Sequence, residues 1–192
     1  MIGIVTCGGK SIRMGADKGL LLHQSKTWAA NAADILSSAD MQVFISIRAE
    51  QFDLYNKIFE TGTIILDETL GIGGPMKGIF SAHLQFPQED LFVLACDMLL
   101  MQPIMIAYLI GKSKTETGDA FVFTNNGSME PLCGVYTAGG LAKIDGLYRQ
   151  QQLERFSMKY ILSKMDTKCF DLPEAWAQHF KNYNAESDLN SL

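Results

Sequence analysis

The sequence has no residue pairs at the spacing that a structural zinc site needs. Its four cysteines are far apart, and no two of them form a C-x-x-C pair: Cys7, Cys96, Cys133 and Cys169. Its three histidines are equally scattered. A structural zinc site is therefore not expected. Dispersed cysteines are typical of proteins from reducing compartments, so we expect a cytoplasmic protein.

Long apolar runs and an excess of positive charge are also missing. No apolar stretch approaches the ~20 residues that a membrane-spanning helix needs. The first residues, MIGIVTCGGK, lack the basic start and long apolar run of a signal peptide. We therefore expect no membrane association. The net charge of −5 also argues against nucleic acid as a partner, because nucleic-acid-binding proteins present a basic face.

The chain does have enough apolar residues to build a core. Hydrophobic residues make up 47% of its 192 residues and charged residues 19%, which predicts one globular domain over residues 1–192. Short apolar runs alternate with segments of helical periodicity. We expect strands at residues 2–7, 43–47, 63–66, 91–95, 120–124 and 132–136, and helices at 27–37, 51–59, 76–84 and 103–110.

Strands that are apolar on both faces and are separated by helices indicate the α/β class. We expect a three-layer α/β/α, Rossmann-like fold with a mostly parallel sheet. Ligands of such sheets bind at the carboxyl ends of the strands. The residues at those ends are therefore the candidates for a site: Gly8 and the residues after it, Ser46, Asp67, and Cys96 with Asp97.

The loop after the first expected strand has the composition of a phosphate-binding loop. Backbone N–H groups can approach a phosphate where side chains are absent, and Gly8 and Gly9 provide such a place. The loop also holds three cations, Lys10, Arg13 and Lys18. It does not fit the P-loop pattern, which would need a glycine at Ile4, and adjacent glycines break the dinucleotide pattern G-x-G-x-x-G.

The pattern that fits is G-G-x-x-x-R-M-G-x-D-K, from Gly8 to Lys18. It resembles the signature loop of nucleotidyltransferases with a glycosyltransferase-A-like sheet, the nucleotide-diphospho-sugar transferase type. Within that group the chain most resembles the molybdenum cofactor guanylyltransferases. Their usual Leu-Ala-Gly-Gly is Thr6-Cys7-Gly8-Gly9 here. Four further fragments follow in the family's order, at residues 74–78, 96–97, 130–136 and 182–189, although the family's Thr-Pro-Glu is Ala-Glu-Ser at 185–187.

The resemblance implies a role for each candidate residue. Arg13 and Lys18 would contact the triphosphate and Asp97 would hold Mg²⁺, so these three are the expected catalytic residues. The expected nucleotide-binding residues are Thr6, Cys7, Gly8, Gly9, Lys18, Ser46, Asp67 and Asp97. Asn182 and Asn184 would contact the second substrate. Simpler roles stay open: the glycines can shape a turn, Asp67 and Asp97 can cap turns, and the asparagines can form Asx-turns.

The activity that the resemblance implies is transfer of GMP from GTP to molybdopterin, with Mg²⁺ as cofactor and pyrophosphate as product. It also implies docking to the proteins that insert or deliver the molybdenum cofactor. Two alternatives remain. One is a cytidylyltransferase for molybdopterin or for a sugar or polyol phosphate. The other is an inactive nucleotide-binding adaptor, which the departures at Thr6, Cys7 and residues 185–187 would permit.

Overall fold

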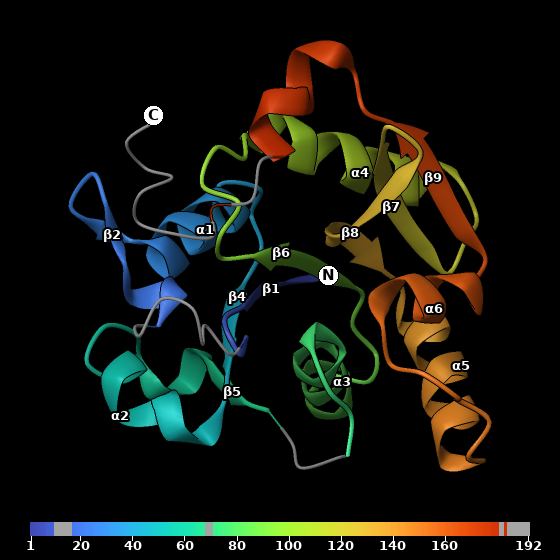
Figure 1. Cartoon of the computed structure of the whole chain (residues 1–192), viewed down its shortest axis with the longest axis horizontal. Helices are drawn as coiled ribbons and strands as arrows, with labels where there is room; N and C mark the ends of the chain where they lie inside the picture. Colours follow the sequence, from blue (N-terminus) through green and yellow to red (C-terminus); the bar gives the residue numbers. More distant parts are fainter. Residues whose placement is uncertain (10–16, 68–70, 181–182, 184–192) are drawn as a thin grey trace.

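The computed structural model of the chain describes residues 1–9, 17–67, 71–180 and 183. Within these residues a seven-stranded sheet forms the centre of the fold, in the order β5-β4-β1-β6-β8-β7-β9 (Figure 1). In chain order its strands are β1 (Ile2–Thr6), β4 (Val43–Ile47), β5 (Ile64–Leu66), β6 (Leu91–Ala95), β7 (Ala120–Asn125), β8 (Ser128–Tyr136) and β9 (Thr167–Asp171). A separate two-stranded hairpin joins β2 (Leu22–His23) to β3 (Lys26–Thr27).

The sheet is mostly parallel, as predicted. β5, β4, β1 and β6 run side by side in one direction, and β7 is parallel to β9. β8 is antiparallel to both of its neighbours, β6 and β7. The four parallel strands therefore bring their carboxyl ends to the same edge of the sheet, which is where the fold class predicts a ligand site.

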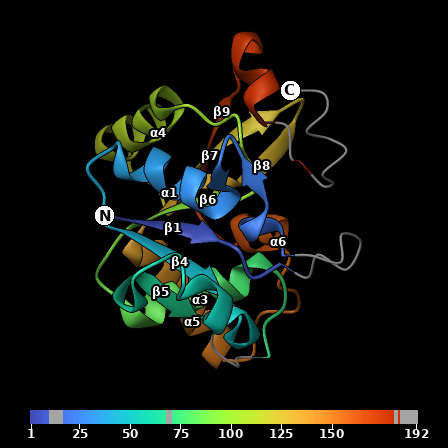
Figure 2. The ribbon, with the colours of Figure 1, turned by 90° about the vertical axis from the view of Figure 1, so that its left-hand side faces the viewer.

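Helices cover both faces of the sheet (Figure 2). One face packs against α1 (Trp28–Ser37) and α4 (Pro103–Thr115). The other packs against α3 (Pro75–Gln85), α5 (Ala138–Arg149) and α6 (Met158–Ser163). Successive strand residues point to opposite faces, so Val5 joins the first cluster and Ile4 the second, both fully buried. The predicted three-layer α/β/α architecture is confirmed.

Local sequence explains where several helices begin. The Thr27 hydroxyl accepts a hydrogen bond from the backbone N–H of Ala30, at 3.2 Å, and so caps α1. Pro75 and Pro103 occupy first-turn positions of α3 and α4, where a missing N–H costs nothing. The strands expected from the sequence are confirmed, and so are the helices expected at 27–37, 76–84 and 103–110. The main differences are that α4 continues to Thr115 and that β8 begins at Ser128.

The helix expected at residues 51–59 is wrong in its length. A 3₁₀ turn (Ala49–Gln51) leads into a single helical turn, α2 (Phe52–Tyr55), and Asn56 caps its carboxyl end. Asparagine is a weak helix former because its side chain competes with the backbone for hydrogen bonds, which is consistent with an early helix end here. β9, α5 and α6 are further elements that the sequence patterns left unassigned. Among the described residues, no helix has the length and apolarity to cross a bilayer.

Candidate functional site

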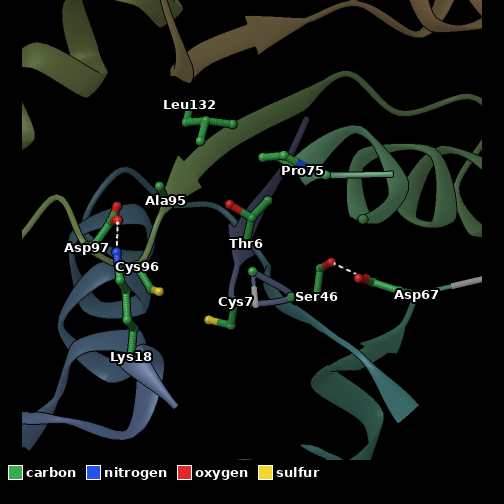
Figure 3. A pocket seen from close by; sticks show the side chains of 14 residues that line it. Thr6, Cys7, Lys18, Ser46, Asp67, Pro75, Ala95, Cys96, Asp97 and Leu132 are labelled. Carbon is green, nitrogen blue, oxygen red and sulfur yellow. Dashed lines mark hydrogen bonds and ion pairs between the residues drawn. The ribbon is translucent and has the colours of Figure 1, made fainter. Parts of the chain in front are cut away.

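A pocket lies where the parallel strands end (Figure 3). The β1 end contributes Thr6, Cys7, Gly8 and Gly9, and the β6 end contributes Ala95, Cys96 and Asp97. Ser46 comes from β4 and Asp67 from directly after β5. The remaining lining residues are Lys18, Gly74, Pro75, Gly78 and Leu132. The sequence expectation that these strand ends share one site is met, and the roles of the residues stay predictions.

One end of the pocket holds an ion pair. Lys18 Nζ donates to Asp97 Oδ2 at 3.3 Å, and each of the two side chains is 21% exposed. The lysine comes from the return of the first loop and the aspartate from the end of β6, so residues 79 positions apart meet here. The pair supplies one group that attracts phosphate and one that attracts a cation, at the same place. The backbone N–H of Tyr183 also donates to the Asp97 carbonyl, at 3.2 Å.

The opposite end of the pocket holds a hydrogen-bonded carboxyl group. The buried Ser46 hydroxyl donates to Asp67 Oδ1 at 2.7 Å. Burial raises the pKa of the Asp67 carboxyl, while the Ser46 hydrogen bond and the charges of Lys77 and Arg48 act in the opposite direction. In Figure 3, Thr6 and Cys7 lie between this pair and the Lys18–Asp97 pair. The pocket thus has two polar ends separated by the end of β1.

Two glycines make room for the Asp67 end. A Cβ on Gly8 would collide with Asp67 Oδ2, and a Cβ on Gly78 would collide with Ser46 Oγ. A Cβ on Gly78 would also lie 3.2 Å from Asp67 Oδ1. A side chain at either position would therefore force the Ser46–Asp67 pair to shift. Gly8 was predicted as a site residue. Gly78 belongs to the 74–78 fragment that the resemblance singled out, but no role was predicted for it.

Hydrogen bonds to the Asp17 carboxylate hold the backbone next to Lys18. Asp17 Oδ1 accepts from the backbone N–H of Gly19 at 3.0 Å and from the Tyr55 hydroxyl at 2.9 Å. Asp17 Oδ2 accepts from Gln51 Nε2. None of Asp17, Gln51 and Tyr55 lines the pocket. Sequence reasoning missed Gln51 and Tyr55, and the only available signal was their position on an expected helix that follows β4.

Cysteine chemistry is not favoured at this site. Contact with the Cys7 thiol, burial, and the nearby Asp97 and Asp17 carboxylates raise the pKa of the Cys96 thiol well above its usual range. A thiol that stays protonated is a poor nucleophile. Cys7 and Cys96 are both buried and pack in the core cluster below the pocket. Their side chains are therefore packing groups that border the pocket.

The described part of the chain has no cluster of three or more histidine, cysteine, aspartate or glutamate side chains that could cage a metal ion. Asp97 offers one carboxylate at the pocket surface. Mg²⁺ commonly binds through one or two carboxylates, water and substrate phosphates. The donor set at Asp97 fits that mode of binding and does not fit a metal held by protein ligands alone.

Three predicted site residues, and one further cation of the first loop, lie outside the residues that the structure describes. Arg13 and Lys10, on the first loop, and Asn182 and Asn184, near the carboxyl terminus, lie outside the described residues. Every other predicted site residue lines the pocket.

Comparisons with known proteins agree with this architecture. A family model described as the MobA-like NTP transferase domain matches residues 3–164. A probable molybdenum cofactor guanylyltransferase of Flavobacterium johnsoniae is 28% identical over 190 residues, which cover 98% of this chain and 94% of that protein. One from Pyrococcus furiosus is 30% identical over 193 residues and covers 100% and 96% of the two chains. The crystal structure of molybdopterin-guanine dinucleotide biosynthesis protein A from Archaeoglobus fulgidus superposes with a TM-score of 0.80 at 20% identity, covering 100% and 96%.

Proposed function

Since the chain belongs to the MobA-like NTP transferase family, we propose that it transfers GMP from GTP to molybdopterin and releases pyrophosphate. Relatives that match almost its full length carry the name molybdenum cofactor guanylyltransferase, which supports this choice of substrates. The observation that carries the proposal is the two-ended pocket. One end pairs Lys18 with Asp97, the other pairs Ser46 with Asp67, and both line the same cavity.

The Lys18 end suits the triphosphate. Lysine donates charge-assisted hydrogen bonds to phosphate, and these are stronger than bonds between neutral groups. Negative charge grows on the α-phosphate and on the leaving pyrophosphate during transfer. A cation fixed at that position stabilises the transition state more than the bound substrate. Arg13, on the same loop, is proposed to add a second cation to the triphosphate.

The Asp67 end suits guanine. The N1–H and N2–H₂ groups of guanine are donors on one edge of the base, and a carboxylate accepts from both. Ser46 holds Oδ1 of that carboxylate at 2.7 Å, so the acceptor is oriented before the base arrives. Gly8 and Gly78 leave room for this Ser46–Asp67 pair, because a Cβ on either would collide with one of its oxygen atoms. A cytosine, which offers a different set of donors, would satisfy this carboxylate less well.

Mg²⁺ would be held by Asp97 together with the nucleotide phosphates, and it would supply charge neutralisation at the reacting phosphate. Lys18 lies 3.3 Å from the same carboxylate and keeps it paired. Engagement of Lys18 with the triphosphate would release Asp97 for the metal. The two roles are therefore linked through one ion pair.

The reaction needs no nucleophile from the protein. An oxygen of the molybdopterin phosphate attacks the α-phosphorus of GTP, a new P–O bond forms, and the bond from the α-phosphorus to the bridging oxygen breaks as pyrophosphate leaves. The attacking phosphomonoester is largely ionised at neutral pH because its second pKa is about 6. The raised pKa of the Cys96 thiol agrees with its having no covalent role. Positioning and charge carry the catalysis.

A nucleotide panel tests the proposal. Purified protein is incubated with Mg²⁺, molybdopterin and one of GTP, CTP, ATP or UTP, and pyrophosphate and the dinucleotide product are measured. We expect product with GTP. Product with CTP alone would identify a cytidylyltransferase, and nucleotide binding without product under any condition would identify an adaptor.

A further inference from the structure

A cluster of hydrogen bonds surrounds Asp17, which precedes Lys18, and has no part in the chemistry described above. It joins three segments that are distant in sequence: the end of β1, the loop return at Asp17, and the turn that holds Gln51 and Tyr55. Gln51 is 4% exposed and Tyr55 is fully buried. Buried polar side chains cost stability unless their partners are in place, so such a cluster has defined geometry.

Gln51 is the centre of the cluster. Its Nε2 donates to the Cys7 carbonyl at 3.2 Å and to Asp17 Oδ2. Its Oε1 accepts from the backbone N–H of Arg48 at 2.7 Å. One side chain thus ties the end of β1 and the segment after β4 to the loop return. Glutamine suits the position because its amide offers donors and an acceptor on a single group.

Tyr55 adds a second fixed bond to the same carboxylate. Its hydroxyl donates to Asp17 Oδ1 at 2.9 Å. Burial, and then the neighbouring Cys7, Cys96 and Asp17 groups, raise the pKa of the Tyr55 hydroxyl far above its usual value. The hydroxyl therefore stays protonated and able to donate at neutral pH. A Cβ on Gly19 would collide with this hydroxyl and lie 3.2 Å from Cys7 Sγ, so the backbone at Gly19 packs directly on it.

Lys18 lies between two residues that the cluster holds, Asp17 through its carboxylate and Gly19 through its backbone N–H. Asp17 before it is bound by Gln51 and Tyr55, and the Gly19 N–H after it is bound by Asp17. We propose that Gln51 and Tyr55 are positioning residues, which act through Asp17 to fix where Lys18 meets the nucleotide phosphates. This inference rests on the proposed function, because it assigns the phosphate contact to Lys18.

A double-mutant cycle tests the proposal. Tyr55→Phe removes only the hydroxyl, and Lys18→Met removes only the cation. The dissociation constant of a fluorescent GTP analogue is measured for the wild-type protein, both single variants and the double variant. Tyr55→Phe alone should weaken binding about tenfold, a size that residues without contact to a ligand can have when they hold a residue that binds it. In the Lys18→Met background the same change should weaken binding less than twofold.

The affinity for guanosine distinguishes a positioning role of Tyr55 from a general loosening of the pocket. Guanosine lacks phosphates and does not reach Lys18, so its affinity, measured by competition, should be the same in wild-type protein and Tyr55→Phe. Tyr160→Phe is the matched control, since Tyr160 lies on α6, does not line the pocket, and accepts a hydrogen bond from the Glu154 N–H at 3.4 Å. Gln51→Glu, which places a second carboxylate beside Asp17, should reproduce the Tyr55→Phe pattern more strongly.

Two results would overturn the inference. Equal losses of GTP affinity from Tyr55→Phe in both backgrounds would show that Tyr55 acts independently of Lys18. A parallel loss of guanosine affinity would show a general loosening of the pocket. A wild-type protein that binds no GTP would instead reject the proposed function, so the two failures are distinguishable.

Discussion

Replacing Asp97 by asparagine should change nucleotide affinity in opposite directions with and without metal. In the structure Lys18 is paired with Asp97 at 3.3 Å, so a triphosphate must draw the lysine away from that carboxylate. It must also approach the carboxylate's own negative charge. Both costs disappear in Asp97→Asn. In metal-free buffer the variant should therefore bind GTP more tightly than the wild-type protein.

The size of the effect follows from the ion pair. Two unit charges 3.3 Å apart attract by roughly 5 kcal/mol at an effective dielectric constant of about 20. Solvent screening and side-chain ordering reduce the net worth of a partly exposed pair to about 1 kcal/mol. That corresponds to about a fivefold gain in metal-free GTP affinity. With Mg²⁺ present, the variant lacks the metal's carboxylate, and turnover should fall on the order of 100-fold.

Isothermal titration calorimetry with GTP, in EDTA and then in Mg²⁺, measures both effects. Asp34→Asn is the matched control, because Asp34 forms an exposed ion pair with Lys26 away from the pocket and its loss should change neither affinity. Weaker or unchanged GTP binding by Asp97→Asn in EDTA would refute the reasoning. Full turnover of that variant in Mg²⁺ would refute the assignment of the metal.

Three further variants probe the rest of the pocket. Gly78→Ala should weaken GTP binding more than tenfold and lower the free energy of unfolding by about 1–3 kcal/mol, because its Cβ would displace the Ser46 hydroxyl. Gly139→Ala, where a Cβ meets open space, should change neither. Calorimetry measures the affinity and thermal melts measure the stability. Wild-type GTP affinity should fall as the pH is lowered from neutral, because protonation at a raised pKa removes the Asp67 acceptor. Asp67→Asn should lack this component, and equal pH profiles would contradict it. Because the pKa of Asp67 is raised in the folded protein, the free energy of unfolding of the wild-type protein should fall as the pH rises from the ordinary carboxyl pKa to the raised one. Asp67→Asn should flatten this pH dependence in thermal melts. Cys7→Ala should keep turnover within about threefold, since Gln51 contacts only the Cys7 backbone carbonyl, and a large loss would show a role for the thiol.

The candidate site was predictable from sequence because its residues follow strand ends. Lys18, Asp67 and Asp97 are distant in the chain, but β5, β4, β1 and β6 are parallel neighbours, so the residues after them meet. A run of buried apolar residues that ends in a polar residue is a local signal. Its consequence in three dimensions follows from the fold class alone.

The supporting residues were not predictable in the same way. Gln51 and Tyr55 lie on a segment that reads as an ordinary amphipathic helix. Their role depends on hydrogen bonds to the Asp17 carboxylate, which lies 34 and 38 positions earlier in the chain. The length of that helix was also misjudged, since the helix ends after Tyr55 with Asn56 as its C-cap residue, and the apolar periodicity of the segment does not mark that end. β9 was missed because an edge strand such as Thr167–Asp171 is half exposed and mixes charged with apolar residues.

A crystal structure with Mg²⁺ and a GTP analogue whose α–β bridging oxygen is replaced by methylene tests the central claim most directly. The account predicts guanine beside Asp67 and Ser46, the triphosphate against Lys18, and a cation bridging Asp97 and the phosphates. A nucleotide bound in the reverse direction, or outside this pocket, would contradict it.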